Sequence, residues 1–260
     1  MTSLFTVAAH FQLFVMVLCR TTGIFLVAPV FSNQVVPKLA KVLACAAVAL
    51  CLLPVALETQ GNAAEPVTWV GFGLAAGKEL CVGALLGFFA LLAYTSVQVA
   101  GELLSEQMGF MMSRIADPTT GQEMAVLAHL ATVLALLLFV GLNGHHWLLA
   151  ALARSYQRVP VGGFSLSGLT MGRCIDGFAR MCESGIVLAA PVLCATLLTT
   201  IAVGIIARLV PQINAMMMAF PLRIAVGLVM LGLALPFIAH AAEHQFVAMA
   251  RDLVPLLGGS

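Results

Sequence analysis

Charged side chains are scarce in this sequence: 9% of the 260 residues are Asp, Glu, Lys or Arg, whereas 62% are hydrophobic. A soluble domain of this length has about 25% charged residues. Too few charges are available to cover a water-exposed surface, so lipid or an apolar protein assembly must cover most of it. The formal net charge of +1 gives no indication that nucleic acid or an acidic substrate is a partner.

Several motifs of soluble and secreted proteins are also missing. The seven cysteines include no C-x-x-C pair and lie mostly in apolar runs, so we interpret them as small hydrophobic residues of packed helices. Neither G-x-x-x-x-G-K-[ST] nor G-x-S-x-G occurs, which argues against ATP hydrolysis by this chain. No Lys or Arg precedes Arg20, whereas a cleaved signal peptide begins with a basic region, so the first helix is expected to be retained.

The sequence is rich in long apolar segments, of which there are roughly six. Because open strands do not survive in lipid and no alternating barrel pattern is visible, the predicted fold class is an all-α integral membrane protein of helical hairpins. A single membrane-embedded domain is expected over residues 1–260. The segments are Phe11–Cys19 with Ile24–Phe31, Val42–Leu57, Val67–Val99, Met124–Leu142, Gly185–Ala207 and Ile224–Ala242.

The third segment is longer than one membrane span requires. As a single helix it would extend roughly 50 Å, whereas the hydrocarbon core of a bilayer is about 30 Å thick. It therefore projects from the bilayer, breaks, or does not sit squarely in lipid. It also contains Gly73-x-x-x-Gly77 and Gly83-x-x-x-Gly87, a spacing that lets two helices approach closely, although chance is a serious alternative in a glycine-rich sequence.

Four charged residues interrupt or flank the apolar segments: Arg20, Lys78, Glu79 and Glu102. Charges within membrane helices are costly and are usually paired or face a pore. Lys78 and Glu79 are adjacent and point about 100° apart on a helix, so each is expected to find a different partner. We predict buried charges that form ion pairs at subunit interfaces, and we favour this role over ion conduction.

The sequence contains one motif that is typical of an enzyme. His240, Glu243 and His244 form the H-x-x-E-H pattern of inverted zincins. Zinc hydrolysis needs a third protein ligand, and after His244 the only acidic residue is Asp252. We therefore expect no catalytic activity, no metal and no cofactor, and we keep an intramembrane zinc peptidase as the alternative. A secondary transporter is a further alternative, but no pair of similar halves with broken helices is visible.

Several short motifs occur in the order found in one known family, across nearly the whole chain. On these motifs the sequence resembles the FliR/SctT family of type III secretion export-gate subunits, although Met216-Met217-Met218 departs from the family pattern. The motifs are Arg20 before Ala28-Pro29-Val30-Phe31 and Val36-Pro37-x-x-x-Lys41, Gly77-Lys78-Glu79-Leu80 before Gly83-x-x-x-Gly87-Phe88, Gly101-Glu102 with Gln107-Met108-Gly109 and Asp117-Pro118, Asn143-Gly144-His145 with Trp147-Leu148, and Pro211-Gln212-x-Asn214 with Phe220-Pro221-Leu222.

The resemblance implies a pore-forming subunit of a FliP–FliQ–FliR-like core complex in the bacterial inner membrane, at the flagellar basal body. Such a subunit helps unfolded flagellar proteins cross that membrane, and a virulence injectisome is the alternative system. The implied partners are FliP-like and FliQ-like membrane subunits, FlhB-like and FlhA-like export components, unfolded export substrates and the lipid bilayer. The resemblance also implies that much of the apolar chain sits above the bilayer plane, held by sister subunits.

A polar stretch follows the third apolar segment. On its residues alone, a solvent-facing loop is the favoured interpretation, because short motifs are weak evidence. The resemblance instead implies a plug loop inside the export pore, and a polar loop can leave a channel without stranding apolar surface. The predicted plug comprises Met111, Met112, Ser113, Arg114, Ile115, Ala116, Asp117, Pro118, Thr119, Thr120, Gly121 and Gln122.

A second candidate segment lies between the last two apolar segments, flanked by Arg208 and Arg223. Its residues alone indicate an ordinary helical hairpin turn anchored by positive charges. It resembles the Gln-Ile-Asn turn of FliQ, which implies the cytoplasmic entrance of the pore, where FlhB-like proteins pack. The predicted turn residues are Pro211, Gln212, Asn214, Phe220 and Pro221.

Overall fold

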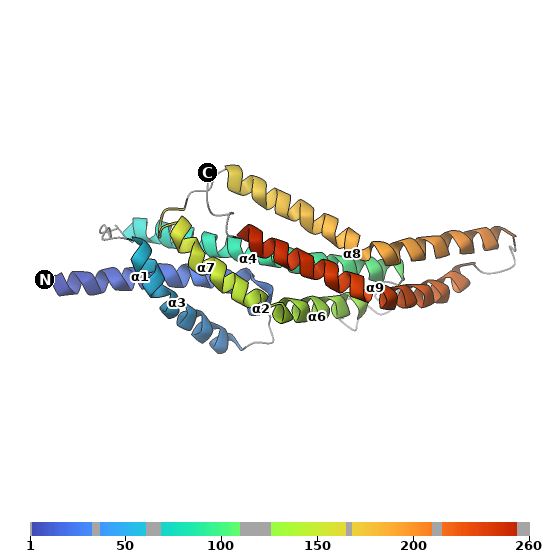
Figure 1. Ribbon diagram of the computed structural model, residues 1–260, viewed down its shortest axis with the longest axis horizontal. Helices are drawn as coiled ribbons and strands as arrows, with labels where there is room; N and C mark the ends of the chain where they lie inside the picture. The colour runs from blue at the N-terminus through green and yellow to red at the C-terminus, as the bar shows by residue number, and fades with distance from the viewer. Residues whose placement is uncertain are drawn as a thin grey trace. The chain divides into compact units, whose positions relative to one another are not determined.

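The structure is a computed structural model that describes residues 2–32, 37–60, 69–109, 126–164, 168–209 and 215–253. Every regular element in these ranges is a helix, so the all-α prediction is confirmed there. Figure 1 follows the helices from α1 in blue to α9 in red. Their bounds are α1 Thr2–Val27, α2 Pro29–Ser32, α3 Lys38–Gln60, α4 Trp69–Gln107, α6 Val126–Gly141, α7 Gly144–Arg158, α8 Gly168–Leu209 and α9 Ala215–Leu253.

Within the described ranges, five helices are long and apolar enough to cross a membrane: α1, α3, α4, α8 and α9. The bent pair α6 and α7 adds a sixth candidate span, in agreement with the roughly six predicted segments. Pro54, Pro191, Pro221 and Pro236 lie inside these helices and each removes one backbone hydrogen bond. Membrane helices tolerate such residues because neighbouring side chains and helices satisfy the freed backbone groups. The chain is an integral membrane protein by this criterion.

Local sequence signals explain two of the helix breaks. α1 ends at Val27 because Pro29 has no backbone N–H and disfavours the helical conformation at Ala28. Between α6 and α7, Asn143 adopts a left-handed conformation with φ of 57°. Asparagine is one of the few residues that enter this region readily. The helix therefore breaks at Asn143, directly after the predicted apolar segment Met124–Leu142.

The helices are grouped in two compact units, and each draws on segments that are far apart in the sequence. Unit 1 contains Met1–Leu92, Asn143–Gly177 and Phe246–Ser260, and unit 2 contains Ala93–Leu142 and Phe178–Gln245. The division falls inside α4, α8 and α9. The single domain predicted over the whole chain remains a prediction.

In unit 1, α1 packs against α3 and against the first half of α4, and α3 also contacts α7. The hydroxyl of Thr22 lies 3.5 Å from the Cys45 sulfur, between α1 and α3. A small apolar cluster under the turn after α7 joins Val82 of α4 to Val159 and Phe164. Unit 1 is therefore held by contacts between α1, α3, α4 and α7.

In unit 2, the second half of α4 contacts α6, α8 and α9. The Gln98 amide donates a hydrogen bond of 3.1 Å to Thr132 of α6, and Ser96 lies 2.8 Å from the Gln245 side chain of α9. A Cβ added at Gly185 of α8 would lie 2.9 Å from Val99, so the two helices are in close contact there. Inter-helical hydrogen bonds and small residues are the usual means by which membrane helices associate.

The structure extends the helices beyond the predicted segments. α4 is unbroken from Trp69 to Gln107, so of the three options for the overlong segment, a break is excluded. The region from Arg154 to Glu183 was not predicted as a span, yet it includes the end of α7 and the first third of α8. Charged residues lower the hydropathy of this region, so no apolar span is predicted there. The charged residues Arg173, Asp176, Arg180 and Glu183 are nevertheless spaced three or four residues apart, which is typical of a helix.

Candidate functional site

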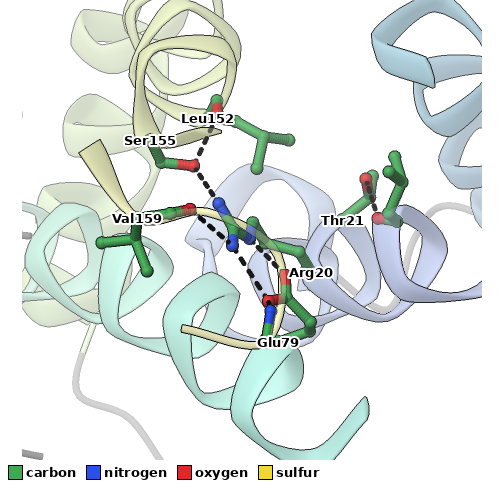
Figure 2. Close-up of polar contacts among 8 residues, drawn as sticks. Arg20, Thr21, Glu79, Leu152, Ser155 and Val159 are labelled. Carbon is green, nitrogen blue, oxygen red and sulfur yellow. Dashed lines mark hydrogen bonds and ion pairs between the residues drawn. The ribbon is translucent and has the colours of Figure 1, made fainter. Parts of the chain in front are cut away.

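A fully buried ion pair lies at the centre of unit 1. Arg20 of α1 donates two hydrogen bonds to Glu79 of α4, from Nε to Oε2 at 2.5 Å and from Nη2 to Oε1 at 3.0 Å. Both side chains have no exposed surface. Figure 2 shows the guanidinium and carboxylate facing each other from the two helices. This two-pronged geometry is the strongest arrangement available to an arginine and a carboxylate.

Two further donors of Arg20 bind the end of α7 and the turn after it. Nη1 donates to the Ser155 hydroxyl at 3.0 Å, and Nη2 donates to the Val159 carbonyl at 3.2 Å. The Ser155 hydroxyl in turn donates to the carbonyl of Leu152 at 2.6 Å. These contacts, also drawn in Figure 2, tie α7 to the ion pair.

The turn after α7 supplies a donor to the carboxylate. The backbone N–H of Gly162 donates to Glu79 Oε1 at 2.8 Å. Gly162 has φ of 80°, and Gly163 N–H donates to the Pro160 carbonyl at 3.0 Å, which closes a tight turn. Glycine occupies this third turn position readily because it has no Cβ. The turn therefore aims a backbone dipole at Glu79.

An aromatic ring completes the site. The guanidinium carbon of Arg20 lies 4.2 Å from the centre of the Tyr156 ring, within the range of a cation–π contact. Tyr156 is fully buried, and none of the described residues is a hydrogen-bond partner of its hydroxyl. The ring therefore contributes through its face, and its hydroxyl is the one poorly satisfied group of the site.

Glycines allow the ion pair to form, because α1 and α4 cross at backbone contact. A Cβ added at Gly83 would overlap the carbonyl oxygen of Arg20, and one added at Gly87 would lie 3.0 Å from the Val27 Cβ. On α1, a Cβ at Gly23 would lie 2.7 Å from the backbone nitrogen of Ala84. The prediction that Gly83-x-x-x-Gly87 supports close helix packing is confirmed.

The arrangement is suited to holding helices together. Arg20 and Glu79 are hydrogen-bonded to each other and to α7 or the turn after it, and neither side chain has exposed surface. Such a site joins α1, α4, α7 and the turn after α7 at one point. We refer to Arg20, Glu79, Ser155 and Tyr156 as the buried charge centre.

The four charges predicted at subunit interfaces therefore have different surroundings. Arg20 and Glu79 pair with each other inside the chain, which the sequence analysis did not foresee. Lys78 and Glu102 are exposed on the isolated chain. An interface role for these last two remains a prediction, and the adjacent Lys78 and Glu79 do have separate surroundings, as their 100° separation indicated.

The predicted loop and turn fall mostly outside the described residues. All twelve positions of the predicted plug, from Met111 to Gln122, lie in the range 110–125, and Pro211, Gln212 and Asn214 lie in the range 210–214. Phe220 and Pro221 are described and lie inside α9, so the turn they were assigned to is shorter than predicted. A proline near the start of a membrane helix is tolerated because few of its backbone bonds are lost.

Phe220 packs against Gly109, where the described part of the chain after α4 ends. Gly109, two residues after the end of α4, has φ of 84°, and a Cβ added there would lie 2.9 Å from the Phe220 ring. Met108 is fully buried against Gly227, two turns further along α9. The first turns of α9 therefore hold the end of α4 from which the chain continues into residues 110–125.

The H-x-x-E-H motif lies on the outer surface of α9. His240 is 79% exposed and Glu243 is 51% exposed, with 3.9 Å between His240 Nδ1 and Glu243 Oε2. The two imidazole rings of His240 and His244 are 6.1 Å apart. Among the described residues, no group of three or more His, Cys, Asp or Glu side chains is arranged to hold a metal ion.

A sequence model for the family described as bacterial export proteins, family 1, matches residues 11–249. The chain belongs to this family. The match begins before Arg20 and ends after Gln245, so it covers the buried charge centre and all of unit 2.

Individual relatives are similar over nearly their full length. Flagellar biosynthetic protein FliR of Escherichia coli K12 is 30% identical over 240 residues, covering 92% of this chain and 90% of the relative. FliR of Bacillus subtilis 168 is 29% identical over 256 residues, which cover 96% of this chain and 97% of the relative. Yop proteins translocation protein T of Yersinia pestis is 26% identical, covering 94% and 95%. Relatives named for flagellar biosynthesis and for Yop protein translocation thus both align with more than 90% of this chain.

Proposed function

We propose that this chain is a pore-forming subunit of a type III secretion export gate, which helps unfolded proteins cross the bacterial inner membrane. The observation that carries the proposal is the family match over residues 11–249, together with end-to-end similarity to FliR proteins. A flagellar role is favoured over a virulence role because the Asn143-Gly144-His145 and Pro211-Gln212 motifs resemble the flagellar branch of the family.

Helix length supports a role inside a larger assembly. α4 and α9 each have 39 residues and α8 has 42. At about 1.5 Å per residue these helices are roughly 60 Å long, about twice the 30 Å of a hydrocarbon core. Exposed large apolar side chains occur along α8 from Leu169 to Leu209. A bilayer alone cannot cover a surface of that length, so FliP-like and FliQ-like subunits are the partners we propose for the remainder.

Residues Met111–Gln122, within the range 110–125, are the proposed plug of the pore. Its sequence from Ser113 to Gln122 is polar and turn-rich, with Arg114, Asp117, Pro118 and Gly121 between two apolar spans. A plug must be displaced by cargo, so its contacts should be few and polar. The contacts of Gly109 and Met108 with α9 support the proposal by fixing the point from which this segment starts.

Deletion of Arg114–Gly121 tests the proposed plug. Cells that express the deleted chain with its partner subunits should become leaky to ions or small solutes, because the wall of the pore is built by other segments. The measurement is membrane conductance or small-solute uptake. As a control, deletion of Asn62–Glu65, in the polar stretch between α3 and α4, should leave permeability unchanged. An assembled complex with unchanged leakage after the first deletion would show that residues 110–125 only connect α4 to α6.

A further inference from the structure

α4 contains two pairs of glycines spaced four residues apart, and a helix of the same chain packs against only one of these pairs. Gly83 and Gly87 are in backbone contact with α1, as described above. A Cβ added at Gly73 or Gly77, in contrast, would have no atom within 4 Å. All four glycines belong to one helix and one unit, so the structure offers a direct comparison between a used and an unused packing surface.

The unused surface has an uncompensated charge at its edge. Lys78 is exposed, and none of the described residues forms an ion pair with it. Its neighbour Glu79 already pairs with Arg20 and is not available to neutralise Lys78. The positive charge of Lys78 is therefore not balanced by its neighbour on α4. A charged side chain on an otherwise apolar membrane helix is costly unless an opposite charge faces it.

The face between Lys78 and the two glycines is apolar and open. Val70, Leu74 and Cys81 are spaced at four and seven residues, so they lie on one side of the helix. Val70 is 75% exposed and Leu74 is 67% exposed, while Cys81 is also exposed. We call this surface, from Val70 to Cys81, the free face of α4. It lies in unit 1, on the side of α4 away from Val82 and Glu79, which are buried.

We propose that the free face of α4 binds a transmembrane helix of another subunit of the complex, and that this helix places a carboxylate opposite Lys78. The proposal rests on the proposed function, because it requires a multi-subunit assembly. It names the chemistry of the partner: an apolar helix that approaches closely at Gly73 and Gly77 and carries an aspartate or glutamate within reach of the lysine.

The filled half of α4 shows how such a contact works. There a helix, α1, approaches at Gly83 and Gly87 and brings Arg20 to the carboxylate of Glu79. At the free face the charges are reversed: α4 supplies the cation, Lys78, and the partner helix would supply the carboxylate. Small residues let two backbones approach, and an opposite charge selects the partner and its register.

Lipid fits this surface less well than a helix does. Lys78 lies nine residues into α4, about 14 Å from its first residue, Trp69. Acyl chains have no group that neutralises an ammonium, and they gain little from the flat surface at Gly73 and Gly77. A protein helix supplies both the negative charge and the close packing, so it is the occupant that the residues favour.

A photo-activated cross-linking residue at Leu74 tests this proposal in the complete complex in membranes. The expected product is an adduct with a helix of a different subunit, one that carries Asp or Glu near the cross-linked position. Lys78→Glu should lower the adduct yield at least roughly tenfold, because two carboxylates would then face each other. Lys78→Arg should keep the yield, and reversing the partner's acidic residue to Lys should restore it in the Lys78→Glu background.

Gly77→Leu is a second variant that should also lower the adduct yield, since it fills the space at which the partner approaches. Neither Lys78 nor Gly77 makes contacts that hold unit 1 together, so these variants should fold. Adducts with lipid only, with a second copy of this chain, or with a helix whose cross-linking does not respond to Lys78→Glu would each overturn the proposal. If the complex assembles and Leu74 yields no protein adduct, the free face is not an interface, whereas failure of the complex to form would count against the proposed function itself.

Discussion

Replacing Arg20 with Ala should lower the free energy of unfolding of the chain by about 3–5 kcal/mol, the usual cost of removing one partner of a buried ion pair. Glu79 would then be a buried carboxylate that retains only the Gly162 N–H as a donor. Ser155 and the Val159 carbonyl would also lose their donors. We expect a matching loss of thermal stability of the detergent-solubilised complex and a lower amount of the chain in membranes.

Three variants isolate the origin of this effect. Glu79→Gln should be similarly harmful because it leaves the guanidinium without a counter-charge. Glu106→Gln, at an exposed carboxylate on the same helix, should change stability by less than about 0.5 kcal/mol. Tyr156→Phe should be neutral or slightly stabilising, since it keeps the ring under Arg20 and removes a buried hydroxyl without a described partner. If the Arg20→Ala variant were as stable as the Glu106→Gln variant, the buried charge centre would not stabilise the chain.

Substitution of Gly83 should have the second largest effect. A Cβ at this position overlaps the carbonyl oxygen of Arg20, and backbone atoms cannot move aside as a flexible side chain can. Gly83→Ala should therefore push α1 away from α4 and lengthen the Arg20–Glu79 hydrogen bonds, with a loss of at least about 1–3 kcal/mol in stability. The same thermal measurement on the solubilised complex applies.

The control is Gly204→Ala, at a helical glycine of α8. No atom lies within 4 Å of the added Cβ, and alanine is the better helix former by about 1 kcal/mol. Gly204→Ala should thus preserve or raise the stability of the complex. Equal losses for Gly83→Ala and Gly204→Ala would mean that the complex is sensitive to any added methyl group, and that the crossing of α1 and α4 is not the reason.

Much of the fold follows from periodicity and composition, which are local properties. The apolar segments predict the helices because every backbone group in lipid must be satisfied within its own segment. The breaks at Pro29 and Asn143 follow from single residues with unusual backbone preferences. α7 and the start of α8 were not predicted as apolar spans, because charged residues such as Arg158 and Arg173 lower their hydropathy without preventing a helix.

The buried charge centre could be predicted only in part. Arg20 and Glu79 are recognisable as charges in apolar segments. They are 59 residues apart, however, and neither segment contains a pattern that predicts their pairing. Ser155 and Gly162 carry no signal of their own, because one is a common polar residue and the other contributes through its backbone. A usable signal was the pair Gly83 and Gly87 one and two turns after Glu79, which marks the face where another helix arrives.

The same comparison explains why subunit contacts are harder to predict than contacts inside the chain. Glycine spacing looks alike at Gly73-x-x-x-Gly77 and at Gly83-x-x-x-Gly87, yet only the second pair is filled by α1. Which surface is free becomes visible only after the chain has packed. The exposed charge at Lys78 and the exposed apolar residues beside it then identify the face on which a partner is expected.

The central claim is that this chain functions as one subunit of an export gate, and co-purification tests it most directly. A tagged chain, solubilised in mild detergent from cells that express it at its natural level, should bring down two small membrane proteins, one FliP-like and one FliQ-like. Mass spectrometry would identify them and native gel migration would show one assembly. Recovery of a monodisperse, fully helical and thermally stable monomer without these partners would contradict the claim.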